Sequence, residues 1–304
     1  MKILVTGGAG FIASNIVDAY VAAGHEVAVV DNLTTGKKEN LNPKAEFFPL
    51  DIRDPRLADA INDFAPDIIN HLAAQIDVRK SVSEPIFNAE VNELGTLNLL
   101  NATVQSKVGK IIFASTGGAL YGEVAGKSGA AEDHPMEPIS PYAITKRSVE
   151  LYLYAYWKLY GLKFTVLRYG NVFGPRQDPL GEAGVIAIFC GKMQNGEAPT
   201  IYGDGKQLRD YIYVGDVAAI NLLALEKGEN EFFNVGTGVG TSVNELFAVL
   251  KELMGFKKDA VYAPPRAGEL FRSVLDCGKA AKVLGWRAKT NIRQGLIKTL
   301  RPGW

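Results

Sequence analysis

A tyrosine followed four residues later by a lysine can act as a proton-transfer pair, because on a helix the two side chains lie on one face. The charge of the lysine favours the phenolate and lowers a tyrosine pKa that starts near ~10. This spacing occurs at Tyr142/Lys146, Tyr154/Lys158 and Tyr202/Lys206. Tyr202 lies in a glycine-rich turn, and Tyr154 lies in the middle of a helical pattern, where packing is expected. His71 is a weaker candidate for proton transfer, because it falls inside an apolar strand-like run and is expected to be structural.

Tyr142 has the surroundings that this chemistry requires. It follows Ser140-Pro141, a sequence typical of the first turn of a helix. It also comes about 26 residues after Ser115-Thr116, at the end of a predicted strand, and ligands of open α/β sheets bind at such carboxyl ends. We therefore predict Tyr142 as the base. Ser115 and Thr116 are the candidates for holding a substrate hydroxyl or carbonyl oxygen.

The start of the chain predicts a phosphate-binding turn. A strand-like run at residues 2–6 leads into a glycine-rich turn and then into a helical pattern. Gly7 allows the tight turn, and Gly10 lets a pyrophosphate approach the start of the helix beside Phe11 and Ile12. Asp31, 21 residues after Gly10, can accept hydrogen bonds from a ribose and repels a 2′-phosphate, which favours NAD over NADP. The residues placed to flank an adenine are Asp51 and Ile52.

Short apolar runs alternate with helix-length segments through the first half of the chain. The predicted strands cover residues 2–6, 26–31, 46–50, 67–72, 110–115 and 164–169, and the predicted helices cover 11–23, 86–105 and 141–160. This alternation predicts an α/β fold of the Rossmann type, in which helices cover both faces of a doubly wound parallel sheet. Glycine and proline become frequent after residue 170. We expect an NAD-binding domain at 1–170 and a smaller C-terminal lobe at 171–304, with the segment 212–240 returning to the first domain.

The composition excludes several classes of function. Equal numbers of basic and acidic residues, 33 of each, give no electrostatic footprint for nucleic acid. No apolar run reaches the ~18 residues of a membrane span, so no membrane partner is expected. The two cysteines lie far apart and the three histidines are scattered, so neither a disulfide framework nor a metal site is expected. We therefore expect a cytoplasmic enzyme or binding protein.

Several segments occur in one order along the chain, namely the loop 7–13, Asp31-Asn32-Leu33, His71-Leu72-Ala73-Ala74-Gln75, Asn92-Glu93-Leu94-Gly95-Thr96 and Tyr142-Ala143-Ile144-Thr145-Lys146. Together they resemble the extended short-chain dehydrogenases/reductases. Three later segments, at residues 168–176, 202–211 and 266–269, are similar to the nucleotide-sugar branch of that family, and so is Asp276. The resemblance covers residues 1 to about 286, and it is strongest to the members that invert C4 of UDP-hexoses.

The resemblance implies an NAD-dependent isomerase that acts through a transient 4-keto sugar. Tyr142 would take the proton of the sugar 4-hydroxyl, and Lys146 would hold the nicotinamide ribose and lower the tyrosine pKa. Thr116 or Ser115 would orient the 4-oxygen. The further cofactor contacts would be Asn32, Leu72, Ala73, Ala74, Gln75, Asn92 and Tyr169. The contacts to a UDP-sugar would be Asn171, Val185, Tyr202, Arg209, Arg266, Glu269 and Ser273.

Two further expectations concern partners and substrate range. The family pairs subunits through two long helices, which agrees with an aromatic-rich helix at 141–160 beside the helix at 86–105, so a homodimer is expected. Ser273 stands where some epimerases carry a bulky tyrosine, and a small side chain there would leave room for an N-acetyl group. UDP-N-acetylhexosamines are therefore expected as additional substrates.

Other functions remain open at this stage. A dTDP-glucose 4,6-dehydratase would need an Asp-Glu pair where this chain has Gly117-Gly118. A UDP-glucuronate 4-epimerase or decarboxylase would differ mainly in how the sugar C6 is held, which the sequence does not place. A binding protein that senses NAD would keep the fold without the chemistry. The presence of Thr116, Tyr142 and Lys146 together favours an enzyme.

Overall fold

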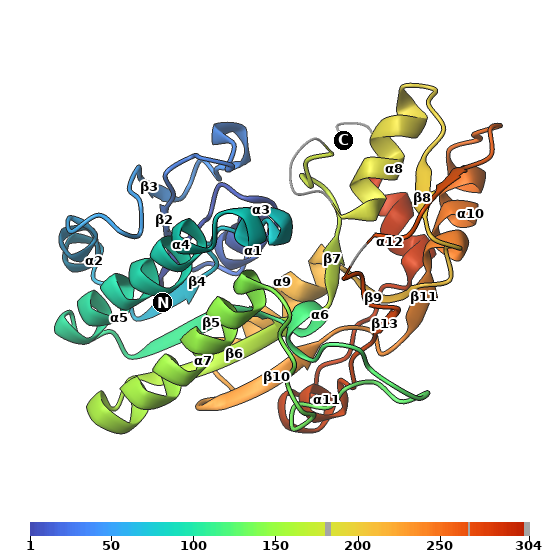
Figure 1. Ribbon diagram of the computed structural model, residues 1–304. Helices are drawn as coiled ribbons and strands as arrows, with labels where there is room; N and C mark the ends of the chain where they lie inside the picture. Colours follow the sequence, from blue (N-terminus) through green and yellow to red (C-terminus); the bar gives the residue numbers. More distant parts are fainter. Residues whose placement is uncertain (180–183, 267, 301–304) are drawn as a thin grey trace.

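The central layer of the protein is a parallel β-sheet. The computed structural model describes residues 1–179, 184–266 and 268–300, and the sheet has the strand order β10-β6-β5-β4-β1-β2-β3 (Figure 1). Its strands are β1 (Lys2–Thr6), β2 (Glu26–Val30), β3 (Glu46–Phe48), β4 (Ile68–His71), β5 (Lys110–Thr116), β6 (Lys163–Tyr169) and β10 (Glu231–Val235). All neighbouring strands in it are parallel. The predicted strands are all present, and β10 comes from the segment expected to return.

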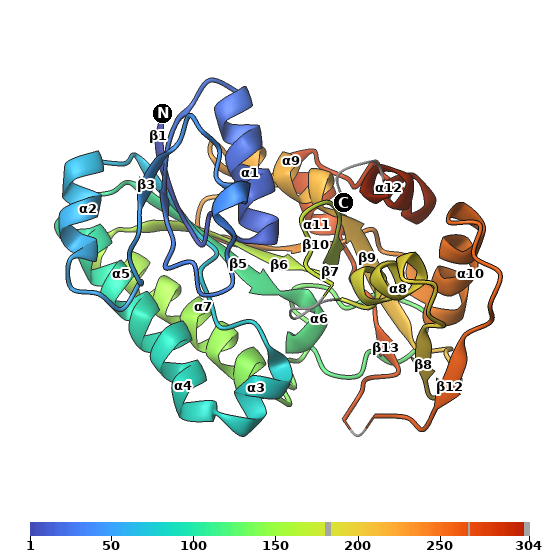
Figure 2. The ribbon, with the colours of Figure 1, turned by 90° about the horizontal axis from the view of Figure 1, so that it is seen from above.

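Helices cover both faces of this sheet, because its strands are apolar on both sides. Ile3 and Val5 of β1 share one core with α1 (Phe11–Ala22), α9 (Val214–Ala224) and α11 (Gly278–Leu284). Leu4 points to the opposite face, where the core includes α2 (Leu57–Phe64), α5 (Gly95–Gln105) and α7 (Pro141–Tyr160). Figure 2 shows α1 and α9 on one side of the sheet and α5 and α7 on the other. The predicted doubly wound α/β fold is confirmed.

The predicted helix at 86–105 is continuous but not uniform. It consists of α4 (Pro85–Ala89), a π-helical stretch η2 (Glu90–Leu94) and then α5. Before this helix, the short elements η1 (Lys38–Asn40), α2 and α3 (Val78–Ser83) were not predicted. Among the described helices, none combines the length and apolar character that crossing a membrane requires.

A second lobe lies beside the edge at which β5 and β6 end (Figures 1 and 2). Its small sheet joins β7 (Asn171–Phe173), β9 (Leu208–Tyr213), β11 (Gly240–Ser242) and β13 (Arg272–Ser273). A separate parallel pair is formed by β8 (Thr200–Tyr202) and β12 (Val261–Ala263). The helices α8 (Val185–Gln194), α10 (Val243–Leu253) and α12 (Ile292–Thr299) pack into a core of their own around Phe189, Leu246 and Leu296. The short helix α6 (Gly117–Leu120) follows β5 directly.

Candidate active site

The turn between β1 and α1 has the shape of a phosphate cradle. Gly7 has a φ of +73°, and a Cβ there would lie 2.8 Å from the backbone nitrogen of Ala73. The Gly7 amide donates to the Val30 carbonyl at 2.8 Å, and the Gly10 amide donates to Gly7 at 2.9 Å. Gly10 is the residue before the first turn of α1, so the amides of Phe11 and Ile12 stand at the positive end of that helix. The turn can therefore receive a pyrophosphate.

Asp31 holds this turn from the end of β2. Its carboxylate accepts hydrogen bonds from the amides of Ala9 at 3.0 Å and Leu33 at 2.7 Å. Burial raises the pKa of Asp31, whereas these two amides lower it. The Ala9 carbonyl is held in turn by the Lys37 amide and the Asn40 side chain, both at 3.0 Å. Each carboxylate oxygen keeps acceptor capacity, so Asp31 can anchor the turn and still meet a ribose hydroxyl.

The ends of β2 and β3 are linked by side chains predicted to flank the adenosine. Asn32 donates from Nδ2 to the Asp51 carboxylate at 2.8 Å. Arg53 binds the same carboxylate and lowers the pKa of Asp51 to about 2. The Ile52 side chain is buried, and its carbonyl accepts from Asn98 at 2.8 Å. The predicted adenosine residues therefore form one polar edge with a buried isoleucine behind it.

The segment after β4 is held from two sides. The Thr6 hydroxyl oxygen accepts hydrogen bonds from the amides of Leu72 at 3.2 Å and Ala73 at 3.1 Å. Ala74 follows, and the next residue, Gln75, is bound by the Asn92 side chain. The Gln75 amide donates to Asn92 Oδ1 at 2.8 Å, and Asn92 Nδ2 donates to the Gln75 carbonyl at 3.0 Å. Asn92 lies in the π-helical stretch, a helix distortion that is frequent at functional sites. Its amide group clamps the segment 73–75 at the strand end.

Two other predicted positions are occupied by structural side chains. His71 is buried and bridges the hydroxyls of Thr6 at 2.7 Å and Thr96 at 2.9 Å. Burial, with a smaller effect from Lys146, lowers the pKa of His71 to about 3, as expected for a structural histidine. The Tyr169 side chain is buried in the sheet core, and its hydroxyl accepts from Asn221 at 2.9 Å. Its backbone, rather than its ring, stands at the strand end.

Tyr142 and Lys146 lie together at the start of α7. Ser140 caps this helix by accepting from the Ala143 amide at 3.2 Å, and Pro141 occupies its first turn, so the helix begins where it was predicted to begin. Lys146 Nζ lies 6.0 Å from the centre of the Tyr142 ring and donates to the Ala114 carbonyl at 2.9 Å. Burial lowers the pKa of Lys146 to about 7. This ammonium is therefore close enough to stabilise a Tyr142 phenolate.

The two candidate hydroxyls at the end of β5 have different surroundings. Ser115 is buried, and its hydroxyl donates to the Glu150 carboxylate at 2.7 Å. Thr116 is partly exposed, and none of the described residues bonds its hydroxyl. A Cβ on Gly118 would lie 4.0 Å from the Thr116 hydroxyl and 3.5 Å from Asn171 Oδ1. Thr116 thus faces the region between β5 and the second lobe, while Ser115 serves the interior.

A pocket of about 310 Å³ opens in the second lobe, within the usual size range of small-molecule sites. Six of the seven predicted substrate residues line it, namely Asn171, Val185, Tyr202, Arg209, Arg266 and Glu269. Ser273 does not line it, but its hydroxyl donates to the Gly118 carbonyl at 3.2 Å. Ala267, which belongs to the segment 266–269, lies outside the described residues.

The charged groups of this pocket suit a phosphate ester. The Arg266 guanidinium lies 3.8 Å from the centre of the Tyr202 ring, and Arg209 lies 3.5 Å from the Glu269 carboxylate. Asn171 Oδ1 and the Tyr211 hydroxyl are buried in the pocket wall without a hydrogen-bond partner in the described chain. Buried polar atoms without partners are uncommon in folded proteins, and a ligand would satisfy both.

The sequence reasoning missed several pocket residues. Tyr211 has a usable signal, because it stands two residues after Arg209 on β9 and so shares its face of the strand. Lys192 and the apolar wall of Ile188 and Phe189 have no comparable signal, since α8 is apolar on several sides and its pocket face is set by packing.

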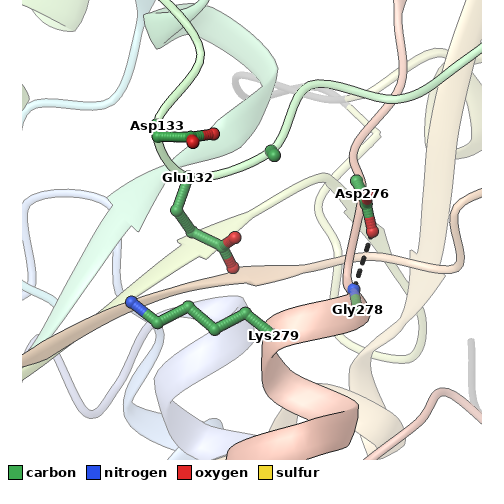
Figure 3. Close-up of a pocket in the computed structure, with 6 residues that line it drawn as sticks. Glu132, Asp133, Asp276, Gly278 and Lys279 are labelled. Atoms are coloured by element: carbon green, nitrogen blue, oxygen red, sulfur yellow. Dashed lines mark hydrogen bonds between the residues drawn. The ribbon is translucent and has the colours of Figure 1, made fainter.

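A second cavity, of about 460 Å³, shares no lining residue with this pocket, and Figure 3 shows the side chains around it. Glu132, Asp133, Asp276 and Lys279 line it, and Asp276 accepts from the Gly278 amide at 2.8 Å. Lys279 is paired with Glu231 at 2.7 Å. None of the predicted catalytic, cofactor or substrate residues lines this cavity, so the candidate active site is the region where the first pocket meets the end of β5.

The chain is similar to proteins of known activity. The model of the NAD dependent epimerase/dehydratase family matches residues 3–236. A UDP-glucose 4-epimerase from Thermotoga maritima, solved with UDP-glucose, is 52% identical with a TM-score of 0.96, covering 98% of this chain and 97% of that one. A UDP-glucose 4-epimerase from Thermus thermophilus in complex with NAD is 48% identical with a TM-score of 0.94 and the same coverage.

A third solved relative differs in the sugar named. It is a UDP-N-acetylglucosamine 4-epimerase from Methanobrevibacter ruminantium in complex with UDP-N-acetylmuramic acid, 37% identical with a TM-score of 0.92, covering 98% of this chain and 96% of that one. The identities and coverage of these structures agree with the family match. The chain therefore belongs to the NAD dependent epimerase/dehydratase family.

Proposed function

We propose that the protein is an NAD-dependent isomerase that inverts C4 of a UDP-hexose and interconverts UDP-galactose and UDP-glucose. One observation carries the proposal. Lys146, the partner of Tyr142, donates to the Ala114 carbonyl near the end of β5, and two residues further along Thr116 lies beside Gly118, which also adjoins the pocket residue Asn171. The relatives named UDP-glucose 4-epimerase support this assignment.

The residues present fit NAD. The glycine turn leaves no room for a side chain at Gly7, and its helix end would receive the pyrophosphate. Asp31, with Asn32 and Asp51 beside it, would hold the adenosine, and the segment 72–75 would line the cofactor on its way to Lys146. The chemistry that NAD supplies when bound is to accept a hydride from C4 and to return it to the opposite face of that carbon.

The protein's own groups would handle the proton and the 4-oxygen. Tyr142, as phenolate, would take the proton of the 4-hydroxyl while the hydride leaves C4, which yields a 4-keto sugar. After the sugar turns, Tyr142 would give the proton back to the 4-oxygen as the hydride returns, so no net redox change occurs. Lys146 stabilises the phenolate, and Thr116, whose hydroxyl is uncommitted among the described residues, would orient the 4-oxygen.

The nucleotide would be held in the pocket of the second lobe. Arg209 and Arg266 suit the pyrophosphate, because a guanidinium group matches phosphate oxygens in a bidentate way. Asn171 and Tyr211 present the buried polar atoms that a ligand would satisfy. Val185, Tyr202 and Glu269 would complete the wall around the nucleotide. We propose that residues 1–170, together with the returning segment 212–240, bind NAD. The remainder of the chain would bind the UDP-sugar.

The geometry at the end of β5 also separates the alternatives. A Cβ on Gly117 would lie 2.6 Å from the Leu275 side chain and 3.1 Å from the Arg168 carbonyl, so an acidic side chain for dehydration would displace the buried Leu275. Ser273 is small, and its hydroxyl is turned to Gly118. We propose UDP-N-acetylhexosamines as additional substrates, and the relative that acts on UDP-N-acetylglucosamine supports this.

The direct test is to follow the anomeric protons of UDP-galactose by NMR, first with purified protein alone and then with added NAD. Formation of UDP-glucose without added NAD shows epimerisation with a retained cofactor, and formation only after addition shows a loosely held one. UDP-N-acetylglucosamine and UDP-glucuronate are run in parallel. If UDP-glucuronate is turned over and UDP-galactose is not, the protein is a UDP-glucuronate 4-epimerase or decarboxylase. If NAD binds and no sugar nucleotide is turned over, the protein is an NAD-sensing binding protein.

We also propose that the protein is a homodimer joined through α7 and the helical segment 85–105. Large apolar side chains on these helices are more than half exposed, namely Ile86, Leu94, Ile144, Leu151, Leu159 and Tyr160. Light scattering should give twice the mass of the chain, and Leu151→Glu should give monomers, while Ile297→Glu on α12 serves as the exposed apolar control. A monomeric wild type would refute the dimer. The cytoplasmic location stays a prediction.

A further inference from the structure

Helix α7 is attached to the end of β5 at two points. Tyr142, Lys146 and Glu150 are spaced by four residues, so their side chains follow one another along one face of the helix. Lys146 Nζ donates to the Ala114 carbonyl at 2.9 Å, and the Ser115 hydroxyl donates to Glu150 Oε1 at 2.7 Å. The two attachments grip successive residues of β5, directly before Thr116. They therefore set the distance between Thr116 and Tyr142.

Glu150 is itself held rigidly. Its carboxylate is fully buried and accepts two parallel hydrogen bonds from Arg168 on β6, at 2.9 Å from Nε and 2.8 Å from Nη2. Arg168 is 2% exposed and also donates to the Tyr121 hydroxyl at 2.9 Å. Arg147 adds an ion pair to the same carboxylate at 2.8 Å from the more exposed side. Bidentate carboxylate–guanidinium pairs fix orientation as well as charge, so the second attachment point cannot drift.

We propose that Glu150 is a positioning residue for the epimerisation, acting through Ser115 and Lys146 rather than by touching the sugar. This inference rests on the proposed function. Glu150, about two helical turns beyond Tyr142, fixes the end of β5 against α7, and its negative charge supports the ammonium group of Lys146. Ser115 belongs to this attachment, so its hydroxyl is a link to Glu150 and not the group that orients the 4-oxygen.

The charged groups around Lys146 define the electrostatic part of this role. On α7 it meets the Tyr142 ring and Glu150, and on β4 it acts on His71. From β5 it meets the Ala114 carbonyl and the Phe113 ring, whose centre lies 4.8 Å from Nζ. Burial lowers the pKa of Lys146, and Glu150 is the group that opposes this change.

Removing the charge of Glu150 would therefore lower the pKa of Lys146 further. In Glu150→Gln, Arg168 also loses its buried partner, and its unbalanced positive charge acts in the same direction. Lys146 must be protonated to stabilise the Tyr142 phenolate, so activity falls as the pH rises through the pKa of Lys146. The alkaline limb of the kcat profile should move to lower pH.

The test measures kcat and KM for UDP-galactose from pH 5.5 to 9.5 with NAD at saturation. In Glu150→Gln we expect the alkaline limb to shift by about one pH unit, which makes kcat about tenfold lower than wild type on that limb, with KM changed less than threefold. The control is Lys110→Gln, because it also removes a buried charge, at the far end of β5, where Lys110 donates to the carbonyls of Ala224 and Lys227. It should lower the melting temperature without moving the limb.

The outcomes separate this inference from the proposed function. A wild type that binds NAD but turns over no UDP-sugar overturns the proposed function. If the wild type turns over UDP-galactose and folded Glu150→Gln has its alkaline limb of the kcat profile at the same pH as wild type, the electrostatic role of Glu150 is overturned. Ser115→Ala, which removes no charge, decides the positioning role even where Glu150→Gln does not fold. We expect kcat of Ser115→Ala to fall three- to tenfold, with the alkaline limb of its pH profile where it is in wild type. An unchanged kcat overturns the positioning role.

Discussion

The Thr116→Val substitution tests which hydroxyl at the end of β5 meets the reacting oxygen. Valine keeps the shape and the strand preference of threonine and removes only the hydroxyl. That hydroxyl is partly exposed and has no partner among the described residues, so its loss leaves no donor or acceptor unpaired in the free protein. We expect the free energy of unfolding to change by less than about 0.5 kcal/mol.

The effect on catalysis should be much larger. During the reaction the 4-oxygen gains negative charge, and a hydrogen bond to a charged group contributes about 1.5–3 kcal/mol. Since about 1.4 kcal/mol corresponds to a factor of ten, Thr116→Val should lower kcat by roughly 10- to 150-fold. KM for the UDP-sugar should change little, because the nucleotide is held in the pocket that contains Arg209 and Arg266.

The assay is the NMR time course with UDP-galactose, together with thermal unfolding and NAD titration of each variant. Ser115→Ala is the comparison, because its hydroxyl donates to Glu150 at 2.7 Å. Ser115→Ala should lose stability and a modest part of kcat, whereas Thr116→Val should keep stability and lose most of kcat. The reverse pattern, with Thr116→Val within twofold of wild type and Ser115→Ala nearly inactive, would assign the 4-oxygen contact to Ser115.

Two further substitutions and one pH dependence test the remaining predictions. Tyr142→Phe should bind NAD as wild type does and lower kcat by roughly 10²- to 10⁴-fold, and turnover near the wild-type rate would remove Tyr142 as the base. Gly7→Ala should weaken NAD binding in calorimetric titration and cost about 1–3 kcal/mol of stability, because its φ is +73° and its Cβ would lie 2.8 Å from the Ala73 nitrogen; unchanged NAD affinity would contradict the cradle. His71 has a folded-state pKa of about 3, below the ~6.5 of an unfolded chain, so the unfolded chain binds more protons between these values and stability should fall by roughly 4 kcal/mol as the pH drops through that window. Urea unfolding at pH 7 and pH 4 should detect about 3 kcal/mol of this loss, because the lower pH lies above the folded-state pKa. An equal loss in His71→Gln would show that another group causes it.

The parts of the fold that were predictable from the sequence have local physical causes. Helix α7 begins at Pro141 because Ser140 caps it and the proline fixes the first turn, and both signals stand in the sequence itself. The turn at Gly7 requires a positive φ that glycine adopts readily, so strand, turn and helix could be placed together. The central strands are short apolar runs of four to seven residues, and this length separates them from the helices.

The elements that were missed depend on contacts between distant segments. The π-helical stretch at Glu90–Leu94 presents Asn92 to the backbone of Gln75, and no local pattern in the sequence predicts a widened helix turn. The strands of the second lobe have only two or three residues in β7, β8, β11, β12 and β13, which is too short for any periodicity to show. Each of these strands pairs with a strand that is distant in the sequence, as β13 at residues 272–273 pairs with β9 at residues 208–209.

The choice between Ser115 and Thr116 shows where sequence reasoning reaches its limit and why. Both are hydroxyl residues at one strand end, and either could reach a sugar oxygen if it faced the site. The deciding residue is Glu150, 35 positions beyond Ser115, and it can accept from Ser115 because Arg168 balances its charge inside the core. A buried carboxylate with a bidentate partner fixes the serine hydroxyl in the interior, and the threonine is left at the mouth of the site. The proposed assignment of Thr116 thus rests on an ion pair whose members are 18 residues apart in the sequence and are brought together by the fold.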